Sequence, residues 1–361
     1  MAAGNLVGAL PSAIVIERKG LRNALRFCTA LTPSLLCARA LLPFFPLQVL
    51  LASAGGVSLS LWAVCISPAV ANTTNERERP FAFSLLFSIG IGVGALGGLA
   101  AGVVPGLLVG LSHGLQLFPP IQLTLIASCC FAALGVIPTL ALPKWDSVVA
   151  VRARRHMSPA LVRFLPAVAA WGLVAGSFSP FANVFFAVHL HLPLRQIGAV
   201  FSISQVAQVA AVLCAPLIFR KWGVLPSIVS AQFATATCFV LLAVGTRSAF
   251  ACCVYVALTA FQWMNEPGIY SLLMKIIPED QRSNASASMS FALSLAQLVA
   301  AGSAGWAFTH LGYPVVLSLI ALVAIIAAAL FHFFIRGQTG PKTVCLAEVS
   351  SGLDEGRSMA N

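Results

Sequence analysis

Apolar segments of helix length, separated by short polar stretches, run through almost the whole chain. A helix needs about 20 apolar residues to cross the hydrocarbon core of a bilayer. The pattern therefore predicts an all-α fold, a polytopic membrane helix bundle with eleven spans. The predicted spans are residues 2–16, 24–44, 47–71, 81–108, 117–142, 161–187, 197–219, 224–244, 249–275, 286–309 and 312–335.

The composition agrees with a membrane protein. Hydrophobic residues make up 59% of the 361 residues and charged residues only 9%, whereas a soluble domain carries about 25% charged residues. The ten cysteines form no Cys-x-x-Cys pair and no other metal-binding spacing, so we expect neither a metal site nor a cofactor. The chain also lacks the His, Asp or Cys constellations of membrane enzymes, so we expect a protein that is not an enzyme.

The net charge of +11 follows the predicted topology. All but three of the 21 Lys and Arg residues fall on one side of the spans, the exceptions being Arg39, Arg195 and Arg247. Basic loops lie in the cytoplasm, which predicts a cytoplasmic C-terminus and removes nucleic acid as the reason for the charge. We expect a monomer in the plasma membrane, or in the inner membrane of a bacterium, with the lipid bilayer as its surroundings.

The first predicted span is short, and an odd number of spans with a cytoplasmic C-terminus puts the N-terminus outside. No basic region precedes this span and no small-residue cleavage site follows it, so it does not look like a signal peptide. The sequence predicts that an initial helix is missing, through a mis-set start codon or a real truncation. The alternative is a genuine N-terminus on the outside.

Charged and glycine landmarks on the basic loops recur 203 residues apart. The matching pairs are Arg18 with Lys221, Gly20 with Gly223, Glu76 with Glu279 and Arg79 with Arg282. Weak repetition of this kind is typical of the parallel repeats of secondary transporters. We therefore expect a helical bundle at 1–142, a cytoplasmic linker at 143–160, a second bundle at 161–336 and a disordered cytoplasmic tail at 337–361.

Small residues recur every fourth position in two of the spans, which stacks them on one helix face and lets another backbone approach closely. We interpret both rows as packing faces, with a role in helix rocking as the alternative. The rows are Gly90, Gly94, Gly98, Gly102 and Gly106 in the first half, and Ser288, Ala292, Ala296, Ala300 and Ala304 in the second.

On these features the chain resembles the major facilitator superfamily, from the family's second helix to its twelfth. The family's loop between helices 2 and 3 carries Gly-x-x-x-Asp-Arg-x-Gly-Arg-Arg, and Glu17, Arg18, Gly20 and Arg22 stand at four of those positions, while Ala13 replaces the first Gly and Leu21 one Arg. The resemblance implies that acidic and basic groups pair across the cytoplasmic mouth. The candidate gate residues are Glu17, Arg18, Arg22, Arg79 and Arg282; the alternative is that they are ordinary topogenic charges.

Two departures separate the chain from the family's drug–proton antiporters. Their Gly-Pro-x-x-Gly-Gly element of helix 5 is incomplete, because Val93-Gly94 precedes Gly97-Gly98. Their Arg-x-x-x-Gly motif of helix 4 has no counterpart, since residues 47–71 contain no charged residue. These departures weaken proton-coupled drug efflux as an interpretation and leave transport intact.

Glu266 is the one acidic residue deep inside an apolar segment. A charged group at this depth is costly, which by default marks a functional site. Gln262, Glu266 and Tyr270 are spaced four apart and share one helix face, with Asn265 beside them. Pro267 lacks the backbone N–H, so we expect a local break in the helix. Glu266 is the candidate for binding substrate or a proton; the alternative is a structural partner for a polar neighbour.

Three further amides are candidates for the opposite wall of a binding site: Asn183, Gln205 and Gln208. Each amide alone is more often an interhelical hydrogen bond than a ligand contact. In the resembled family the cavity is lined mainly by helices 1, 4, 7 and 10, and helix 1 is the one that has no counterpart here.

The sequence thus predicts secondary-active transport of a small solute by alternating access, with protons as a second partner through Glu266. A facilitated-diffusion uniporter is the nearest alternative, and a polytopic membrane sensor or enzyme is the alternative from another class.

Overall fold

The computed structural model describes residues 2–42, 44–111, 119–142, 158–245 and 247–336, and in these ranges every regular element is a helix. The predicted tail and most of the predicted linker lie outside the described residues. The helices of the first part of the chain are α1 (Ala2–Lys19), α2 (Leu21–Leu41), α3 (Phe45–Thr73), α4 (Arg79–Leu111), α5 (Pro120–Ala133) and α6 (Val136–Leu140).

The second part of the chain contains longer helices and one irregular stretch. Its elements are α7 (Pro159–Phe178), the 3₁₀ turn η1 (Ser179–Phe181), α8 (Ala182–Val184), the π-helical η2 (Phe185–His189), α9 (Leu194–Trp222), α10 (Val224–Val244), α11 (Ser248–Ile276), the 3₁₀ turn η3 (Glu279–Gln281), α12 (Arg282–Leu311) and α13 (Tyr313–Arg336). The start of α7 is fixed by its sequence, because Ser158 Oγ accepts the Leu161 N–H at 3.2 Å and Pro159 occupies the first turn.

The predicted all-α membrane bundle is confirmed, and each predicted span corresponds to a helix or to a run of helical elements. Within the described ranges, eight helical stretches are long and apolar enough to cross a membrane. The exceptions are α1, α2 and α11, which pack among the other helices but carry charged residues: Glu17 to Lys19 in α1, three arginines in α2, and Glu266 and Lys275 in α11.

Two predicted spans are interrupted. The span 117–142 divides into α5 and α6 at Gly135, because Pro138 cannot donate to the Leu134 carbonyl and Ile137 N–H bonds there instead at 3.0 Å. The span 161–187 passes through η1, α8 and η2, where Pro180 follows α7. Short 3₁₀ and π segments are common where regular α-helical bonding changes register.

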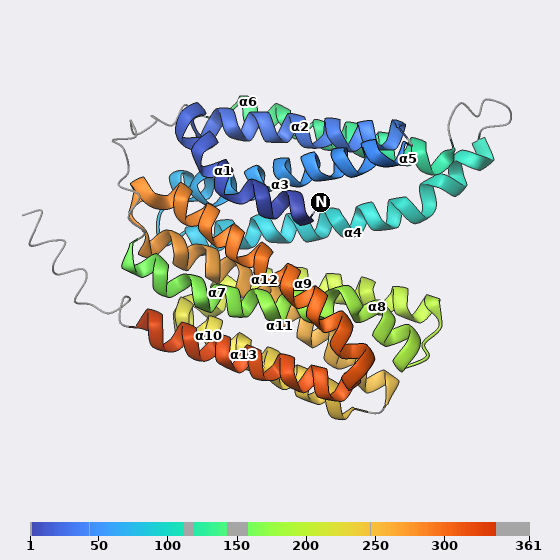
Figure 1. The fold of residues 1–361 in the computed structure, drawn as a ribbon, viewed down its shortest axis with the longest axis vertical. Coiled ribbons are helices and arrows are strands. Elements are labelled where there is room, and N and C mark those ends of the chain that lie inside the picture. Colours follow the sequence, from blue (N-terminus) through green and yellow to red (C-terminus); the bar gives the residue numbers. More distant parts are fainter. Residues whose placement is uncertain (1, 43, 112–118, 143–157, 246, 337–361) are drawn as a thin grey trace, which may run out of the picture.

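The helices form two groups, as Figure 1 shows: α1–α6 lie in the upper part of the view and α7–α13 in the lower part. Across the seam, α1 packs on α12 and α4 packs on α9. These two contacts are equivalent, because at the 203-residue offset α1 corresponds to α9 and α4 corresponds to α12. The two pseudo-symmetric halves are therefore related by position as well as by sequence.

The repeated landmarks adopt the same local structure in both halves. Gly20 and Gly223 each end one helix and begin the next, with φ of 79° and 87° and ψ of 151° and 155°. Residues with a Cβ rarely adopt such positive φ values, which explains glycine at both turns. Arg79 and Arg282 are the first residues of α4 and α12.

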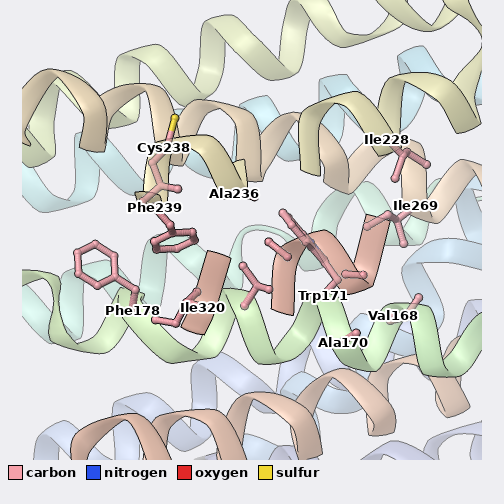
Figure 2. Packing of buried hydrophobic residues seen from close by; sticks show 14 of the residues in the cluster. Val168, Ala170, Trp171, Phe178, Ile228, Ala236, Cys238, Phe239, Ile269 and Ile320 are labelled. Atoms are coloured by element: carbon pink, nitrogen blue, oxygen red, sulfur yellow. The ribbon is translucent and has the colours of Figure 1, made fainter. Parts of the chain in front are cut away.

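The larger apolar core lies in the second half. Phe178 of α7 and Phe239 of α10 meet edge to face with ring centroids 5.8 Å apart, and Ile320 of α13 is buried in the same cluster (Figure 2). Close approach of backbones supports this packing. A Cβ added to Gly176 of α7 would lie 2.6 Å from Cα of Gln297 on α12.

The face of α4 is more open than that of its counterpart. A Cβ added to Gly90, Gly92, Gly94 or Gly97 would meet no other atom within 4 Å. By contrast, α7 packs closely against Leu293, Ala296 and Gln297 of α12. The predicted packing row on α4 is therefore uncovered at Gly90 and Gly94, whereas Ala296, Ala300 and Ala304 of the row on α12 are buried.

Candidate functional site

A cavity of about 510 Å³ lies between the two halves. Its walls come from α1, α3, α4, α7, η1, α11 and α12. Its polar and aromatic lining residues include Asn5, Phe87, Trp171, Gln262, Trp263, Glu266, Tyr270, Ser290, Ser294 and Gln297. A volume of this size is in the usual range for the binding site of a small organic molecule.

The helix face predicted from four-residue spacing lies in this cavity. Gln262, Glu266 and Tyr270 all line it, and all three are half-buried. Trp171 of α7 interacts with the Glu266 carboxylate, but its indole N–H has no partner at hydrogen-bond distance among the described residues. The Glu266 carboxylate of α11 therefore faces the indole of Trp171, an aromatic donor that the sequence-distant helix α7 contributes.

The predicted break at Pro267 is wrong. The helix α11 runs without interruption from Ser248 to Ile276, with Pro267 inside it. On its buried side the helix packs closely against its neighbours: a Cβ added to Gly268 would lie 2.9 Å from Ile228 of α10 and 3.0 Å from Phe219 of α9. Proline still removes one N–H, so the carbonyl of the fourth preceding residue, Trp263, loses its usual helical partner.

Two of the predicted amides lie away from the cavity. Asn265 is buried and does not line it, and its side-chain oxygen and nitrogen have no hydrogen-bond partner among the described residues. It stands one residue, or about 100° of helix rotation, from Glu266. Asn183 of α8 is exposed and lines neither this cavity nor the one described next.

A second cavity, of about 590 Å³, contains the other two amides. Gln205 and Gln208 of α9 line it, together with residues of α3, α4 and α11. It shares Phe87, Trp263 and Tyr270 with the first cavity, so the two are adjacent. Two of the three residues of the predicted opposite wall, Gln205 and Gln208, therefore line an adjacent cavity.

Several lining residues were not among the predicted site residues. Asn5 donates its Nδ2–H to Oγ of Ser294 at 3.4 Å, which joins α1 to α12 beside the cavity. Trp171 has no pattern around it that separates it from a core tryptophan. Ser290 and Ser294 are spaced four apart, a signal that was available in the sequence and that small-residue packing explained equally well.

The predicted gate residues separate into two groups. At the end of the bundle that carries the basic loops, Asn284 of α12 donates to Oε1 of Glu17 at 3.3 Å, and Nη1 of Arg79 donates to the Met274 carbonyl of α11 at 3.3 Å. Both contacts join the two halves. Arg282 instead pairs with Glu279 of its own half at 2.9 Å.

Among the described residues, the other two gate candidates make no hydrogen bond or ion pair between the halves. Arg22 donates to the Leu140 carbonyl of α6 at 3.2 Å, which is a contact inside the first half. Arg18 is exposed. The buried arginines Arg79 and Arg282 lie close enough to influence one another electrostatically, together with Glu76 and Glu279.

Helices of membrane-spanning length, two related halves and a polar cavity between them define a multi-pass membrane protein of the transporter class. The family model described as Major Facilitator Superfamily matches residues 1–301. The chain belongs to this family, and its activity is membrane transport of a small-molecule solute. No curated protein matches the sequence.

Solved structures of transporters share the fold at low sequence identity. The proton:xylose symporter XylE is 14% identical, with 92% of this chain and 84% of that chain covered and a TM-score of 0.74. The E. coli fucose:proton symporter FucP is 12% identical, with 94% and 89% covered and a TM-score of 0.73. The human organic anion transporter MFSD10 is 14% identical, with 91% and 81% covered and a TM-score of 0.69.

Proposed function

We propose that this chain moves a small solute across the plasma membrane by alternating access, and that Glu266 exchanges the coupling proton. The two rocking bodies are the bundles 1–142 and 161–336, joined by the linker 143–160. One observation carries the proposal: Glu266 lines a cavity whose walls come from both bundles. Relative motion of the bundles changes the access to such a cavity without any covalent chemistry.

The surroundings of Glu266 support a proton-carrying role. The side chain is half-buried among Trp171, Trp263 and Tyr270, so its charged form is poorly solvated. A bound proton removes this penalty, and release requires access to water, which the opening of the cavity supplies. XylE and FucP, which share the fold, are described as proton symporters, and this supports an involvement of protons in transport here.

The contacts at the basic end support a gate there. Asn284 with Glu17, and Arg79 with the Met274 carbonyl, join the two bundles at this end. Asn5 lines the cavity, whereas Glu17 lies twelve residues further along the same helix. That separation corresponds to about 18 Å of helix, so the cavity and the gate are at different depths. With basic loops on the cytoplasmic side, the gate closes the cytoplasmic mouth, and the C-terminus is cytoplasmic.

The experiment uses the full chain in proteoliposomes that contain a pH-sensitive dye. Xylose, fucose and a permanently charged styrylpyridinium dye are added one at a time, and solute-linked proton movement is recorded. Glu266→Gln should abolish that movement, while Glu78→Gln should leave it unchanged because Glu78 is exposed and outside the cavity. Full proton-driven accumulation by Glu266→Gln would remove Glu266 from the mechanism. Transport that a protonophore does not affect would favour a uniporter.

A further inference from the structure

The described residues that line the two cavities include a single charged side chain. Among the described residues that line them, Glu266 is the one acidic group, and none is Lys, Arg, His or Asp. The remaining polar groups of these lining residues are amides, hydroxyls and the indoles of Trp62, Trp171 and Trp263. A solute that enters this space therefore meets one negative charge and no positive one.

Among the described residues outside the cavity walls, none supplies a cationic partner for the Glu266 carboxylate. Within the described part of the chain, its interactions involve Trp171 and Tyr270, and no positively charged side chain takes part. A carboxylate kept in an apolar setting without a cation is costly, and a ligand that brings a positive charge removes that cost. A bound solute would therefore supply the positively charged partner of Glu266.

Aromatic rings line the cavity that Glu266 lines. Phe87 of α4 and Tyr270 of α11 pack with ring centroids 5.3 Å apart, and Trp171 and Trp263 complete the aromatic lining of the first cavity. The faces of aromatic rings attract cations that lie within about 6 Å of the ring centre, with Trp the strongest of them. A carboxylate among such rings matches a positive charge that is attached to an apolar body.

We propose that the solute of this site is a monovalent organic cation, whose ammonium or pyridinium group pairs with Glu266 and whose apolar part lies against Phe87, Trp171 and Trp263. This inference rests on the proposed transport function and specifies its substrate class. One carboxylate can hold either a proton or the cation, so the two ligands compete for it. Transport then exchanges one for the other.

The size and chemistry of the site separate this class from its rivals. A bare metal ion is a poor fit, because the described residues contain no group of three or more His, Cys, Asp or Glu side chains. An organic anion would face Glu266 with no compensating charge among the lining residues. A neutral sugar can bond to Gln262, Gln297 and the serines, and it forms the control arm of the test.

The test compares a matched pair of probes on the full chain in lipid nanodiscs. One probe is an N-methylated styrylpyridinium dye, which is permanently positive, and the other is its uncharged parent, which has nearly the same shape. Binding is followed by dye fluorescence and by quenching of protein tryptophan fluorescence, with empty nanodiscs subtracted. We expect the cation to bind at least about tenfold more tightly than the parent, the usual scale of one compensated charge.

Three variants complete the experiment. Glu266→Gln should reduce the preference for the cation to less than about twofold, Glu266→Asp should retain most of it, and Glu78→Gln should leave it unchanged. Equal affinities of the two probes for the unmodified protein would overturn the proposal, and so would a preference that survives in Glu266→Gln. The comparison on the unmodified protein stands even if a variant fails to fold.

Acidification provides an independent readout. Besides Glu266, the titratable side chains that face either cavity are Tyr255 and Tyr270, both on α11; those contributed by α1, α3, α4, α7, α9 and α12 are all non-titratable among the described lining residues. Affinity for the permanent cation should therefore fall on acidification, and Glu266→Gln should remove this dependence. If xylose drives proton movement in proteoliposomes while the charged dye shows no preference, transport stands and the cation assignment fails.

Discussion

Two glycines, one in each half, should respond in opposite ways to the same substitution. Gly176 of α7 faces α12, and a Cβ added there would lie 2.6 Å from Cα and 2.8 Å from the carbonyl oxygen of Gln297. Gly94 of α4 meets no atom within 4 Å of an added Cβ. Gly176→Ala should therefore destabilise the protein, and Gly94→Ala should not.

The magnitudes follow from the contacts. The atoms that Gly176→Ala would strike belong to the backbone of α12, so the helices must move apart, at a cost of about 1–3 kcal/mol for overpacking. Gly94→Ala gains about 0.5–1 kcal/mol of helix propensity without a clash. For a chain of this size, 1 kcal/mol corresponds to roughly 2 °C in the unfolding temperature.

The assay is thermal unfolding in detergent, followed by intrinsic fluorescence under identical conditions for both variants. We expect Gly176→Ala to lower the midpoint by about 2–6 °C and Gly94→Ala to leave it unchanged or raise it by up to about 2 °C. Similar losses for the two variants would refute the reasoning, because they would mean that the face of α4 is covered in the folded protein.

Three further predictions concern the gate, a helix junction and a glycine inside α11. Glu17→Cys combined with Asn284→Cys, joined by a short thiol-reactive crosslinker, should stop transport in proteoliposomes, and reversal of the crosslink should restore it. Gly223→Ala forces a Cβ into the left-handed region and should cost about 1–2 kcal/mol, measured as a lower unfolding temperature than that of Gly198→Ala, where the space is open. Gly268→Ala pushes a methyl group against movable side-chain ends, so its loss should stay below about 2 kcal/mol in the same assay.

Much of the fold could be predicted because lipid imposes simple rules on the chain. Apolar length gave the spans, and the repeated glycines gave equivalent junctions, since Gly20 and Gly223 adopt nearly the same φ and ψ. The break between α5 and α6 was missed, because hydropathy does not register a proline at position 138. The rules concern single segments and do not describe where a helix loses its hydrogen bonds.

The site was predictable in part, for a related reason. Four-residue spacing identified the α11 face that holds Glu266, because helical periodicity is a local property. The same periodicity did not predict which way Asn265 points. Its neighbour Glu266 lines the cavity, whereas Asn265 is buried outside it. Nor could it find Trp171, which reaches Glu266 only through the packing of distant helices. The break expected at Pro267 was wrong, because packing against α9 and α10 overrides the local loss of one bond.

Two hydrogen bonds join α1 to α12 at two different depths of the bundle. Asn5 meets Ser294 at one level, and Glu17 meets Asn284 about 18 Å further along. If the Asn5–Ser294 contact stays in place, a tilt of about 10° between α1 and α12 displaces the Glu17–Asn284 contact by about 3 Å, which is enough to break it. A ligand that draws Ser294 away from Asn5 would weaken this first contact as well. Ligand binding in the cavity and loss of the Glu17–Asn284 contact would then be coupled.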